Sequence, residues 1–489
     1  MPTPDALSRS RRIFIILVLA LVAYWPTLRL GFLWDDHVMI ESNPVLREWS
    51  ISNLKQDFSR DPFSGMGDPY YRPLQTLANR VDYTFWGLHP FGYHLTNLLF
   101  HMANSVLIGE LVIALGFSPL VALLAGCLFG VHPIVVEQLM IIAGRAELMA
   151  LCFSLMNLLL FIQEGSLFLI AGSIVYLLAL FSKESAIMTP ILFLLVAWFR
   201  KKQQPLSNRL WIYLAITGLY LVARSLAVGS RLPSIPPLYA GRFFVQAFPK
   251  ILAVYFRLIL VPWNLHSHRM TPHLSHVWFL YAAVWLGLAA WLMRRKIRWA
   301  AFSLAWFILT LLPKTPAMIV GNFTLDHWAY SAAFGIILPL SIGFVWCWEN
   351  PRPRWRYGLA VAFFPLLIAW ALLVHLNVEL RGTDEKMYRW ALNFTGSHPI
   401  KYNLGVLLLQ TGRAEESLQY FQDVLTTYPD DIHAAHAMAI AFWQTGHQQA
   451  ALSLLERIVK ANPSYRPAAQ SLERMRAENG KELDGSDAN

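Results

Sequence analysis

A series of apolar runs, separated by short polar or basic segments, is the feature of this sequence that most restricts its fold. A membrane-spanning helix needs about 20 mostly apolar residues, with a minimum of about 17. Eleven runs reach or approach this length within residues 1–380. They are Arg12–Leu30, Phe91–Leu115, Pro119–Val131, Leu148–Gln163, Ser166–Phe181, Ala186–Phe199, Leu210–Val228, Val277–Met293, Ala300–Leu312, Trp328–Val345 and Tyr357–Val374. The sequence therefore predicts an all-α, polytopic membrane domain over residues 1–380.

Composition agrees with this class and argues against nucleic acid as a partner. Charged residues make up 14% of the chain, whereas soluble domains carry about 25%. The formal net charge is +10, but the Lys and Arg residues form short clusters between apolar runs, which is typical of cytoplasmic loops. Cys127, Cys152 and Cys347 lie inside apolar runs, so the sequence indicates neither a disulfide framework nor a CxxC metal site.

The basic clusters predict how the chain is threaded through the membrane. Arg9, Arg11 and Arg12 stand at the start of the first run, so we expect an uncleaved first span with its N-terminus on the cytoplasmic side. The clusters at Arg200–Lys202, Arg294–Arg298 and Arg352–Arg356 belong on the same side. They do so only if Phe248–Leu260 is a half-span or an interfacial helix that does not cross fully. The result is about 11 crossings, with the C-terminal domain on the external side.

A repeat of 34 residues replaces the apolar runs after Arg381, and at this spacing Gly412 recurs as Gly446. This is the period of the tetratricopeptide repeat (TPR), a helix–turn–helix unit of which about three are needed for a stable stack. We therefore expect a TPR α-solenoid at residues 381–480 and a disordered tail at residues 481–489. Such a solenoid indicates a partner or a peptide ligand and carries no chemistry of its own.

Two adjacent carboxylates, Asp35 and Asp36, follow the first apolar run by a few residues. Neither could lie in hydrocarbon without a large desolvation cost, so we place them at the membrane–water boundary, at the start of an external loop over residues 31–90. This loop is rich in aromatic residues, and we expect short helices lying on the membrane surface. By itself the pair could simply mark the end of a helix. The functional hypothesis is that it forms the acid/base centre of a membrane-embedded enzyme.

Further polar residues stand where other apolar runs end on the same predicted side. His132 and Glu137 follow the third run and are candidates for contacting a substrate or a metal, although His132 by itself is better explained as a helix-end residue at the interface. Arg145 precedes the fourth run and could pair with Glu147 or with lipid headgroups. Lys183 could extend toward the interface or bind a phosphate. Four histidines between residues 266 and 276 lack metal-ligand spacing, and we interpret them as interfacial.

Several of these residues belong to motifs that resemble one family. In chain order the motifs are Gly31–Asp36, Tyr71–Leu74, Leu88–His101, His132-Pro133 with Glu137, Gly144–Leu148 and Ser182–Glu184. Together they resemble the transmembrane and tetratricopeptide-repeat (TMTC) O-mannosyltransferases and their bacterial-type relatives, which are GT-C-class glycosyltransferases. The resemblance covers roughly residues 25–199, and the C-terminal repeats agree with it. Where the family tends to have a Glu-Arg-Tyr-Leu-Tyr-like run, this chain has Asp326–Tyr330, which lacks the arginine.

The resemblance implies a glycosyltransferase that takes a sugar from a polyprenyl-phosphate donor. The sugar would be added with inversion to an acceptor such as a protein Ser or Thr hydroxyl. Asp35 or Asp36 would accept the proton of that hydroxyl, and the motif does not choose between them. Arg72, Arg145 and Lys183 would stabilise the departing phosphate.

The same resemblance leaves the cofactor open and suggests a location. Glu137 would either bind a divalent cation together with the aspartates or contact the sugar. A lipid-linked donor requires membrane lipid around the site, and a bacterial-type relative would lie in the inner membrane. Its first loop and its repeats would face the external side, where the repeats would present a polypeptide acceptor or bind a partner.

Two other classes of function compete with an enzyme. A non-catalytic membrane scaffold would bind a partner through its repeats, and its aspartates would be inert. A transporter would carry carboxylates near the middle of its spans, whereas the carboxylates here lie mainly at span ends. Asn substitutions at Asp35 and Asp36 separate the first two classes, because only the enzyme would lose a transfer activity.

Overall fold

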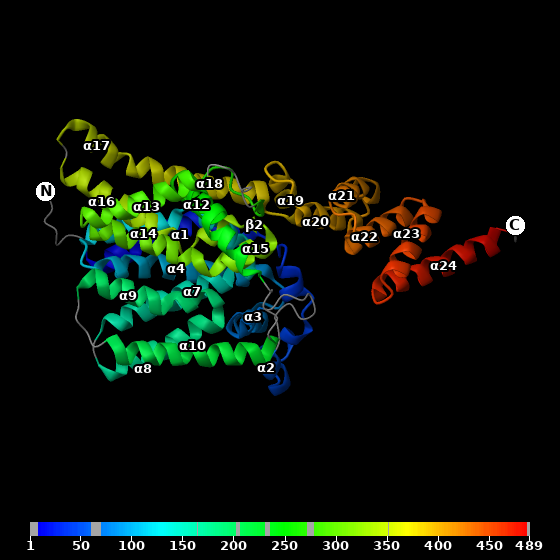
Figure 1. Cartoon of the computed structure of the whole chain (residues 1–489), viewed down its shortest axis with the longest axis horizontal. Helices are drawn as coiled ribbons and strands as arrows, with labels where there is room; N and C mark the ends of the chain where they lie inside the picture. Colours follow the sequence, from blue (N-terminus) through cyan, green and yellow to red (C-terminus); the bar gives the residue numbers. More distant parts are fainter. Residues whose placement is uncertain are drawn as a thin grey trace. The chain divides into compact units, whose positions relative to one another are not determined.

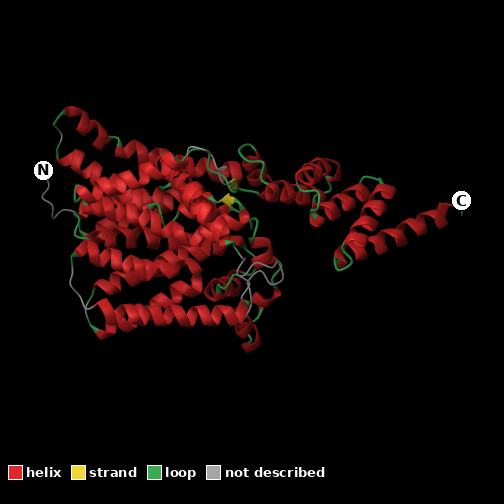
Figure 2. Ribbon diagram, in the orientation of Figure 1, coloured by secondary structure: helices red, strands yellow, loops and turns green. Residues whose placement is uncertain are grey.

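The computed structural model describes residues 8–59, 70–163, 165–201, 206–229, 235–270, 278–350 and 352–486. These residues form two compact units, which we describe separately. Unit 1 comprises residues 1–267 and 271–382, and unit 2 comprises residues 268–270 and 383–489. The described residues are helical apart from the short strands β1 (Arg269–Met270) and β2 (Phe323–Thr324) and the connecting loops, as Figure 2 shows.

The first half of unit 1 contains α1 (Arg9–Tyr24), η2 (Trp25–Arg29), η3 (His37–Glu41), η4 (Pro44–Arg47), α2 (Ile51–Asp57), α3 (Pro73–Trp86), α4 (Pro90–Ala114), α5 (Pro119–Val131), η5 (Pro133–Val135), α6 (Val136–Met140), η6 (Ile142–Gly144), α7 (Arg145–Ile162), α8 (Ser166–Ser182), η7 (Glu184–Met188) and α9 (Thr189–Arg200). The second half contains α10 (Leu206–Val228), α11 (Pro237–Arg242), η8 (Phe243–Ala247), α12 (Phe248–Leu260), α13 (Trp278–Arg294), α14 (Arg298–Leu311), η9 (Leu312–Lys314), α15 (Thr315–Gly321), β2, η10 (Asp326–Ala329), α16 (Phe334–Glu349), α17 (Arg354–Val361) and α18 (Phe363–Arg381).

The long helices of unit 1 run side by side as a bundle (Figure 1). Among the described residues, seven helical segments are long and apolar enough to cross a membrane: Arg9–Arg29, Pro90–Ala114, Ile142–Ile162, Arg209–Val228, Pro237–Leu260, Arg298–Gly321 and Arg354–Arg381. An eighth is formed if α5 and the segment Pro133–Met140, bent by 45°, make one span, and three shorter helices are also apolar. Unit 1 is therefore an all-α, multi-pass membrane domain, as the apolar runs predict.

The helix expected at Phe248–Leu260 has these bounds in the structure, as α12, but further helix precedes it. With η8 and α11 it makes an apolar segment of 24 residues, Pro237–Leu260, that is long enough to cross a membrane. Proline is accepted at the first position of a helix, where a backbone N–H would have no partner inside the helix. The carbonyl of Pro236 receives the N–H of Ala240 and so begins the helix. The number of crossings and their sidedness stay predictions.

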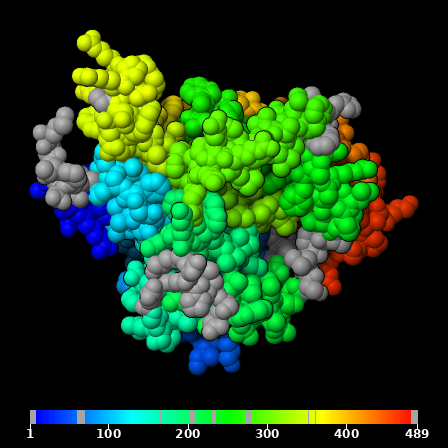
Figure 3. All heavy atoms as spheres, turned by 60° about the vertical axis from the view of Figure 1, so that its left-hand side comes forward, coloured from blue at the N-terminus to red at the C-terminus, as the bar shows by residue number. Residues whose placement is uncertain are grey.

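The basic clusters meet at one end of the bundle. Arg298, at the start of α14, donates to the backbone carbonyl of Phe199 at 3.1 Å, next to the cluster that ends α9. The N-terminal end of α1 and the segment around α17 are also at this end (Figures 1 and 3). This arrangement is what the positive-inside rule requires of cytoplasmic segments.

The first long loop folds into short helices, and one of them, α3, buries its polar face and exposes its apolar face. Its polar residues Asn79, Arg80 and Asp82 are buried inside unit 1, while Phe85 is 76% exposed and Val81 is also exposed. Arg80 forms hydrogen bonds to both oxygens of Asp57, which ties α3 to α2. An exposed apolar face on a helix with a polar buried face indicates contact with lipid.

Unit 2 contains β1 and the helices α19 (Asp384–Leu392), α20 (His398–Gln410), α21 (Ala414–Thr427), α22 (Ile432–Gln444), α23 (Gln448–Ala461) and α24 (Arg466–Ser486). Gly412 and Gly446 occupy the turns within the helix pairs with φ of +78° and +81°, a conformation that favours glycine. Gly405 allows close packing, because a Cβ there would lie 2.7 Å from the Phe421 ring. Unit 2 is thus a TPR stack, and α24 continues to Ser486, beyond the limit expected at residue 480.

Candidate active site at one end of the helix bundle

Asp36 is held by backbone donors from two distant parts of the chain. Its Oδ2 accepts the N–H of Leu33 at 3.1 Å and that of Ile142 at 3.0 Å, and its Oδ1 accepts the N–H of Ala143 at 2.8 Å. The side chain is fully buried. Asp36 therefore links the first loop, by hydrogen bonds, to the segment between α6 and α7.

The backbone of the turn gives the two aspartates different environments. Trp34 has a φ of 52°, a left-handed conformation that costs a non-glycine residue about 1–3 kcal/mol. The N–H of Met39 then bonds to the carbonyl of Asp35 at 2.9 Å, near the start of η3. In this arrangement Asp36 is buried and Asp35 stays partly exposed.

Burial changes the acidity of Asp36. Removal from water raises the pKa of its carboxyl, and the three backbone N–H donors lower it. Burial prevails, so the pKa of Asp36 rises from 3.8 to about 7. A pKa near neutrality suits a general base, but a base must first reach the proton that it removes. Both oxygens of Asp36 face backbone donors, whereas the side chain of Asp35 is partly exposed.

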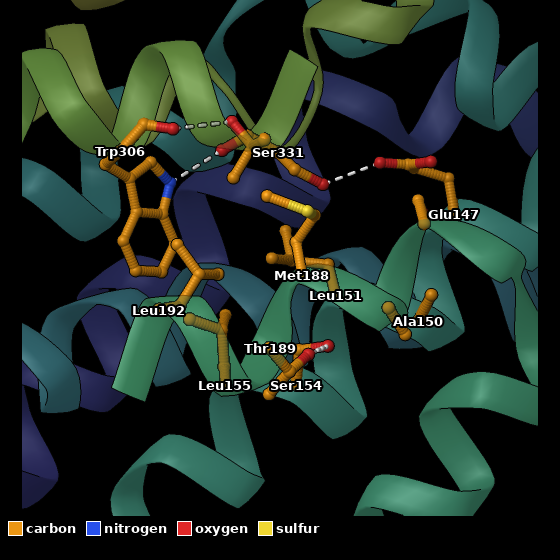
Figure 4. Close-up of a pocket in the computed structure, with 13 residues that line it drawn as sticks. Glu147, Ala150, Leu151, Ser154, Leu155, Met188, Thr189, Leu192, Trp306 and Ser331 are labelled. Atoms are coloured by element: carbon orange, nitrogen blue, oxygen red, sulfur yellow. Dashed lines mark hydrogen bonds between the residues drawn. The ribbon is translucent and has the colours of Figure 1, made fainter. Parts of the chain in front are cut away.

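Glu147, in the first turn of α7, holds two lysines. Lys314 Nζ lies 3.0 Å from Oε1, and Lys183 Nζ lies 3.0 Å from Oε2. Ser331 Oγ donates to Oε1 at 2.6 Å, as Figure 4 shows. Lys314 also donates to the carbonyl of Trp328 at 2.8 Å. The side chains of Glu147, Lys314 and Lys183 are only 2%, 5% and 12% exposed, so this is a buried cluster of charges.

Arg72 and Glu184 form a second ion pair beside this cluster. The guanidinium donates from Nε at 3.1 Å and from Nη2 at 2.7 Å to the two carboxylate oxygens. Burial alone would raise the pKa of Glu184, but Arg72 and then Lys183 hold it below its ordinary range. Since Glu184 directly follows Lys183, the two ion-paired groups adjoin.

A third group surrounds Glu137. His327 Nδ1 lies 2.7 Å from Oε1, and Arg381 Nη1 lies 3.4 Å from Oε2. Gln138 Nε2 donates to the backbone carbonyl of His327 at 3.2 Å. The end of α18 and the η10 segment are therefore joined to α6 by buried polar contacts.

The three groups and the aspartate turn meet at one end of unit 1. Gln75 Nε2 donates to the carbonyl of Ala143 at 2.9 Å, which links α3, and with it Arg72, to the residue that binds Asp36. Lys314 contacts Trp328, the neighbour of His327. Of the residues that the sequence singles out, Asp35, Asp36, Arg72, Glu137 and Lys183 therefore share one region.

Two of the expected site residues are engaged by protein partners. Arg145 is fully buried and donates to Asn97 Oδ1, Asn79 Oδ1 and the carbonyl of Tyr93, at 2.8–2.9 Å. Its ion pair with Asp82, at 2.5 Å, completes a set of protein partners. A guanidinium so enclosed has little capacity for a phosphate, so the geometry argues against Arg145 as a donor ligand.

His132 likewise serves the fold. Its Nδ1 accepts the N–H of Ile134 at 3.1 Å, its Nε2 lies 2.7 Å from the carbonyl of Ile259, and its ring packs on Trp370. Both ring nitrogens are thus engaged by backbone groups. These contacts agree with the helix-end explanation, and the substrate or metal role of His132 stays a prediction.

The described residues contain no group of three or more His, Cys, Asp or Glu side chains that could hold a metal ion. Of the four histidines considered above, His266 and His268 are described, and His273 and His276 lie outside the described residues. The backbone N–H of His266 bonds to Asp326 Oδ2 at 2.9 Å. That Glu137 and the aspartates bind a divalent cation stays a prediction.

Sequence reasoning did not assign Lys314, Ser331, His327 or Arg381 to the site. Lys314 and His327 stand in a polar loop between apolar runs, and this position is the local feature that could have pointed to them. Arg381 follows the last apolar run and, in the sequence, only marks the boundary after which the repeat begins. Their partners are far away in the chain, so no local pattern connects them.

A small pocket opens beside Glu147 between α7, α9 and α14, with a cavity volume of about 30 Å³. Its walls include Leu151, Leu155, Leu192 and Trp306. Figure 4 shows Ser331 between Trp306 and Glu147, with hydrogen bonds to both. This volume holds about two water molecules and no sugar. The pocket is therefore an apolar extension of the polar cluster.

Comparison with known proteins gives one family match and several relatives. A family described as tetratricopeptide repeat matches residues 399–475, within unit 2. The Drosophila melanogaster protein O-mannosyl-transferase Tmtc3 is 26% identical over 512 residues, which cover 86% of this chain and 55% of that protein.

Shorter matches are more similar in sequence. The Xenopus laevis protein O-mannosyl-transferase tmtc2 is 38% identical over 30% of this chain and 18% of that protein. The human protein O-mannosyl-transferase TMTC3 is 35% identical over 30% of this chain and 16% of that protein. The chain thus spans about half, or less, of the length of these relatives in the matched regions.

Proposed function

We propose that this chain, a TMTC-like protein related to the protein O-mannosyl-transferases, is an integral-membrane glycosyltransferase that modifies proteins. Its donor would be a sugar linked to a polyprenyl phosphate, and its acceptor a Ser or Thr hydroxyl of a polypeptide. The observation that carries the proposal is the meeting of Asp35, Lys183, Arg72 and Glu137 at one end of a bundle of apolar helices. The names of the relatives suggest mannose as the first sugar to test.

In the proposed reaction Asp35 is the general base. The acceptor hydroxyl gives its proton to the Asp35 carboxylate while its oxygen attacks the anomeric carbon of the sugar. The bond between that carbon and the phosphate oxygen breaks, and the phosphate leaves with the bonding electrons. Attack opposite the leaving group inverts the anomeric centre. Asp36 would position this turn through its three backbone hydrogen bonds.

The departing phosphate gains negative charge, and cations in a site of low dielectric constant stabilise it strongly. Lys183 and Arg72 are the residues that we assign to this role. Each already has a carboxylate partner, Glu147 and Glu184, which holds it in place before the donor arrives. We assign Glu137, with His327 and Arg381 beside it, to contacts with the sugar.

The proposal also covers location and the role of the repeats. We place the aspartate turn and unit 2 on the external side of the membrane, for a bacterial protein the periplasmic side of the inner membrane. The basic clusters that meet at the opposite end of the bundle support this orientation. The TPR stack would present a polypeptide acceptor or bind a partner protein.

The test is transfer by the purified full-length protein in lipid nanodiscs. Polyprenyl-phosphate-linked mannose and a set of Ser/Thr-containing polypeptides are supplied, and products are identified by mass spectrometry. Transfer by the wild type that is absent in Asp35→Asn and retained in Glu415→Gln, an exposed acid in unit 2, supports the proposal.

A non-catalytic scaffold is the second candidate, favoured by the TPR match at residues 399–475. It predicts no transfer by any variant and the same bound partner for the wild type and Asp35→Asn. Affinity purification of both proteins from the same membranes makes this comparison.

A further inference from the structure

The Glu147 cluster joins parts of the chain that are far apart. Glu147 comes from α7, Lys183 precedes η7, and Lys314 ends η9. One carboxylate oxygen faces each ammonium group at 3.0 Å. Ser331 adds a third donor at 2.6 Å to the oxygen that faces Lys314.

This cluster carries an excess positive charge in a buried place. Glu147 supplies one negative charge and the two lysines supply two positive charges. The adjoining pair of Arg72 and Glu184 is balanced and does not compensate for the excess. Since an uncompensated buried charge is costly, the arrangement favours the binding of one further anion.

The pocket beside the cluster determines what kind of anion fits. Leu151 and Leu155 of α7, Leu192 of α9 and Trp306 of α14 supply apolar walls, and Glu147 itself lines the same pocket. α7 and α14 belong to candidate membrane spans. Neither lysine lines the pocket, but both contact Glu147, which does. A mostly apolar pocket that lies next to two buried lysines within a membrane domain suits an amphiphile with an anionic head.

We propose that Lys183 and Lys314 together bind the phosphate of a polyprenyl-phosphate lipid and that the first isoprenoid unit enters the pocket between α7, α9 and α14. Glu147 is the positioning residue that keeps both ammonium groups directed at the phosphate. Met188 lines the pocket and moves aside on binding, because the cavity of about 30 Å³ is too small for a five-carbon unit and a methionine side chain adapts readily. The inference rests on the proposed function in taking the lipid-linked donor as the ligand.

The first experiment measures the affinity of the full-length protein in nanodiscs for a sugar-free polyprenyl phosphate, so that no transfer is involved. Lys314→Gln is expected to weaken binding at least about 10-fold, since a charge-assisted hydrogen bond is lost. Lys314→Arg keeps the charge and is expected to recover most of the affinity. Lys401→Gln, which removes an exposed ion pair in unit 2, is the matched control and should leave the affinity unchanged.

A second measurement distinguishes binding of a lipid phosphate from binding of free phosphate. It uses a different variant, so it also tests the inference if Lys314→Gln does not fold. Met188→Trp fills the pocket and is expected to weaken lipid binding while binding of inorganic phosphate is unchanged. Inorganic phosphate binding as tight as that of the lipid, or equal lipid affinity in the wild type and Met188→Trp, would overturn the apolar half of the inference. Equal affinity in the wild type and a folded Lys314→Gln protein would overturn the role of Lys314.

Failure of the inference and failure of the proposed function give different results. If Asp35→Asn abolishes transfer but Lys314→Gln keeps both its lipid affinity and its donor KM, the enzyme stands and the phosphate site is wrong. If lipid binding depends on Lys314 but no variant transfers sugar, the phosphate site stands and the enzyme is wrong. A wild-type protein that does not bind polyprenyl phosphate contradicts both.

Discussion

Arg381 Nη1 lies 3.4 Å from Glu137 Oε2, so the last residue of the final helix of unit 1 is paired with a carboxylate of the candidate site. The chain passes from here through Gly382 into unit 2. Both side chains are nearly completely buried. The point where the repeats are attached is therefore held by the same carboxylate that contacts His327.

We expect Arg381→Gln to destabilise the protein by about 3–5 kcal/mol, because it leaves Glu137 buried beside a neutral partner. The double variant Glu137→Gln/Arg381→Gln should lose less than the sum of the two single variants, since no charge is then stranded. Thermal unfolding in detergent measures both effects. Arg476→Gln, which breaks an exposed pair with Glu456, is the control and should cost no more than about 1 kcal/mol. Additive losses would contradict the pairing.

The two aspartates should respond differently to the same substitution. Asp35→Asn is expected to lower the turnover number by about 100-fold or more at unchanged melting temperature, as loss of a general base does. Asp36→Asn is expected to lower the melting temperature, because an amide nitrogen then faces a backbone N–H donor. Transfer assays and thermal unfolding of both variants decide this, and a stable Asp36→Asn protein without activity would reverse the two roles.

The stability of the protein should depend on pH through Asp36. Its pKa is raised from 3.8 to about 7 in the folded state, so the folded protein binds a proton more tightly than the unfolded chain. Stability is therefore expected to fall as the pH rises from about 4 to about 7 and to level off above it. Unfolding free energies across this range test the sign, and in Asp36→Asn this contribution should disappear. A wild-type curve that rises over the same interval contradicts burial as the prevailing cause.

The reversed amphipathic character of α3 predicts contact with lipid. Phe85→Cys can be labelled selectively with a nitroxide, since the three native cysteines are buried. The label should collide more often with dissolved oxygen than with a water-soluble nickel complex in electron paramagnetic resonance, because Phe85 points away from the protein on an apolar face. Glu473→Cys in unit 2 is the control and should show the opposite ratio. If the label collides more often with the nickel complex than with oxygen at both positions, α3 lies in water and the prediction is wrong.

Local patterns in the sequence were sufficient for the architecture. Apolar runs near the length of a membrane span predict helices wherever they occur, and a 34-residue period predicts the TPR stack, because both depend on neighbours along the chain. The same reasoning placed Asp35 and Asp36 in a loop after the first helix. It did not indicate that the helix at Phe248 continues from Pro237, because proline and glycine between apolar runs are more typical of turns.

The tertiary structure alone decided which charged groups meet and which are enclosed. Arg145 and Lys183 look alike as candidate cations, yet packing surrounds Arg145 with Asn79, Asn97 and Asp82. Lys183 instead pairs with Glu147, which lines a pocket. Lys314 joins Glu147 across 167 positions of the chain, a separation at which no periodicity operates. The sequence by itself determined what kind of protein this is, because helix formation and membrane insertion follow local hydrophobicity. The partners of each buried charge depend on how the helices pack, and that information is not local.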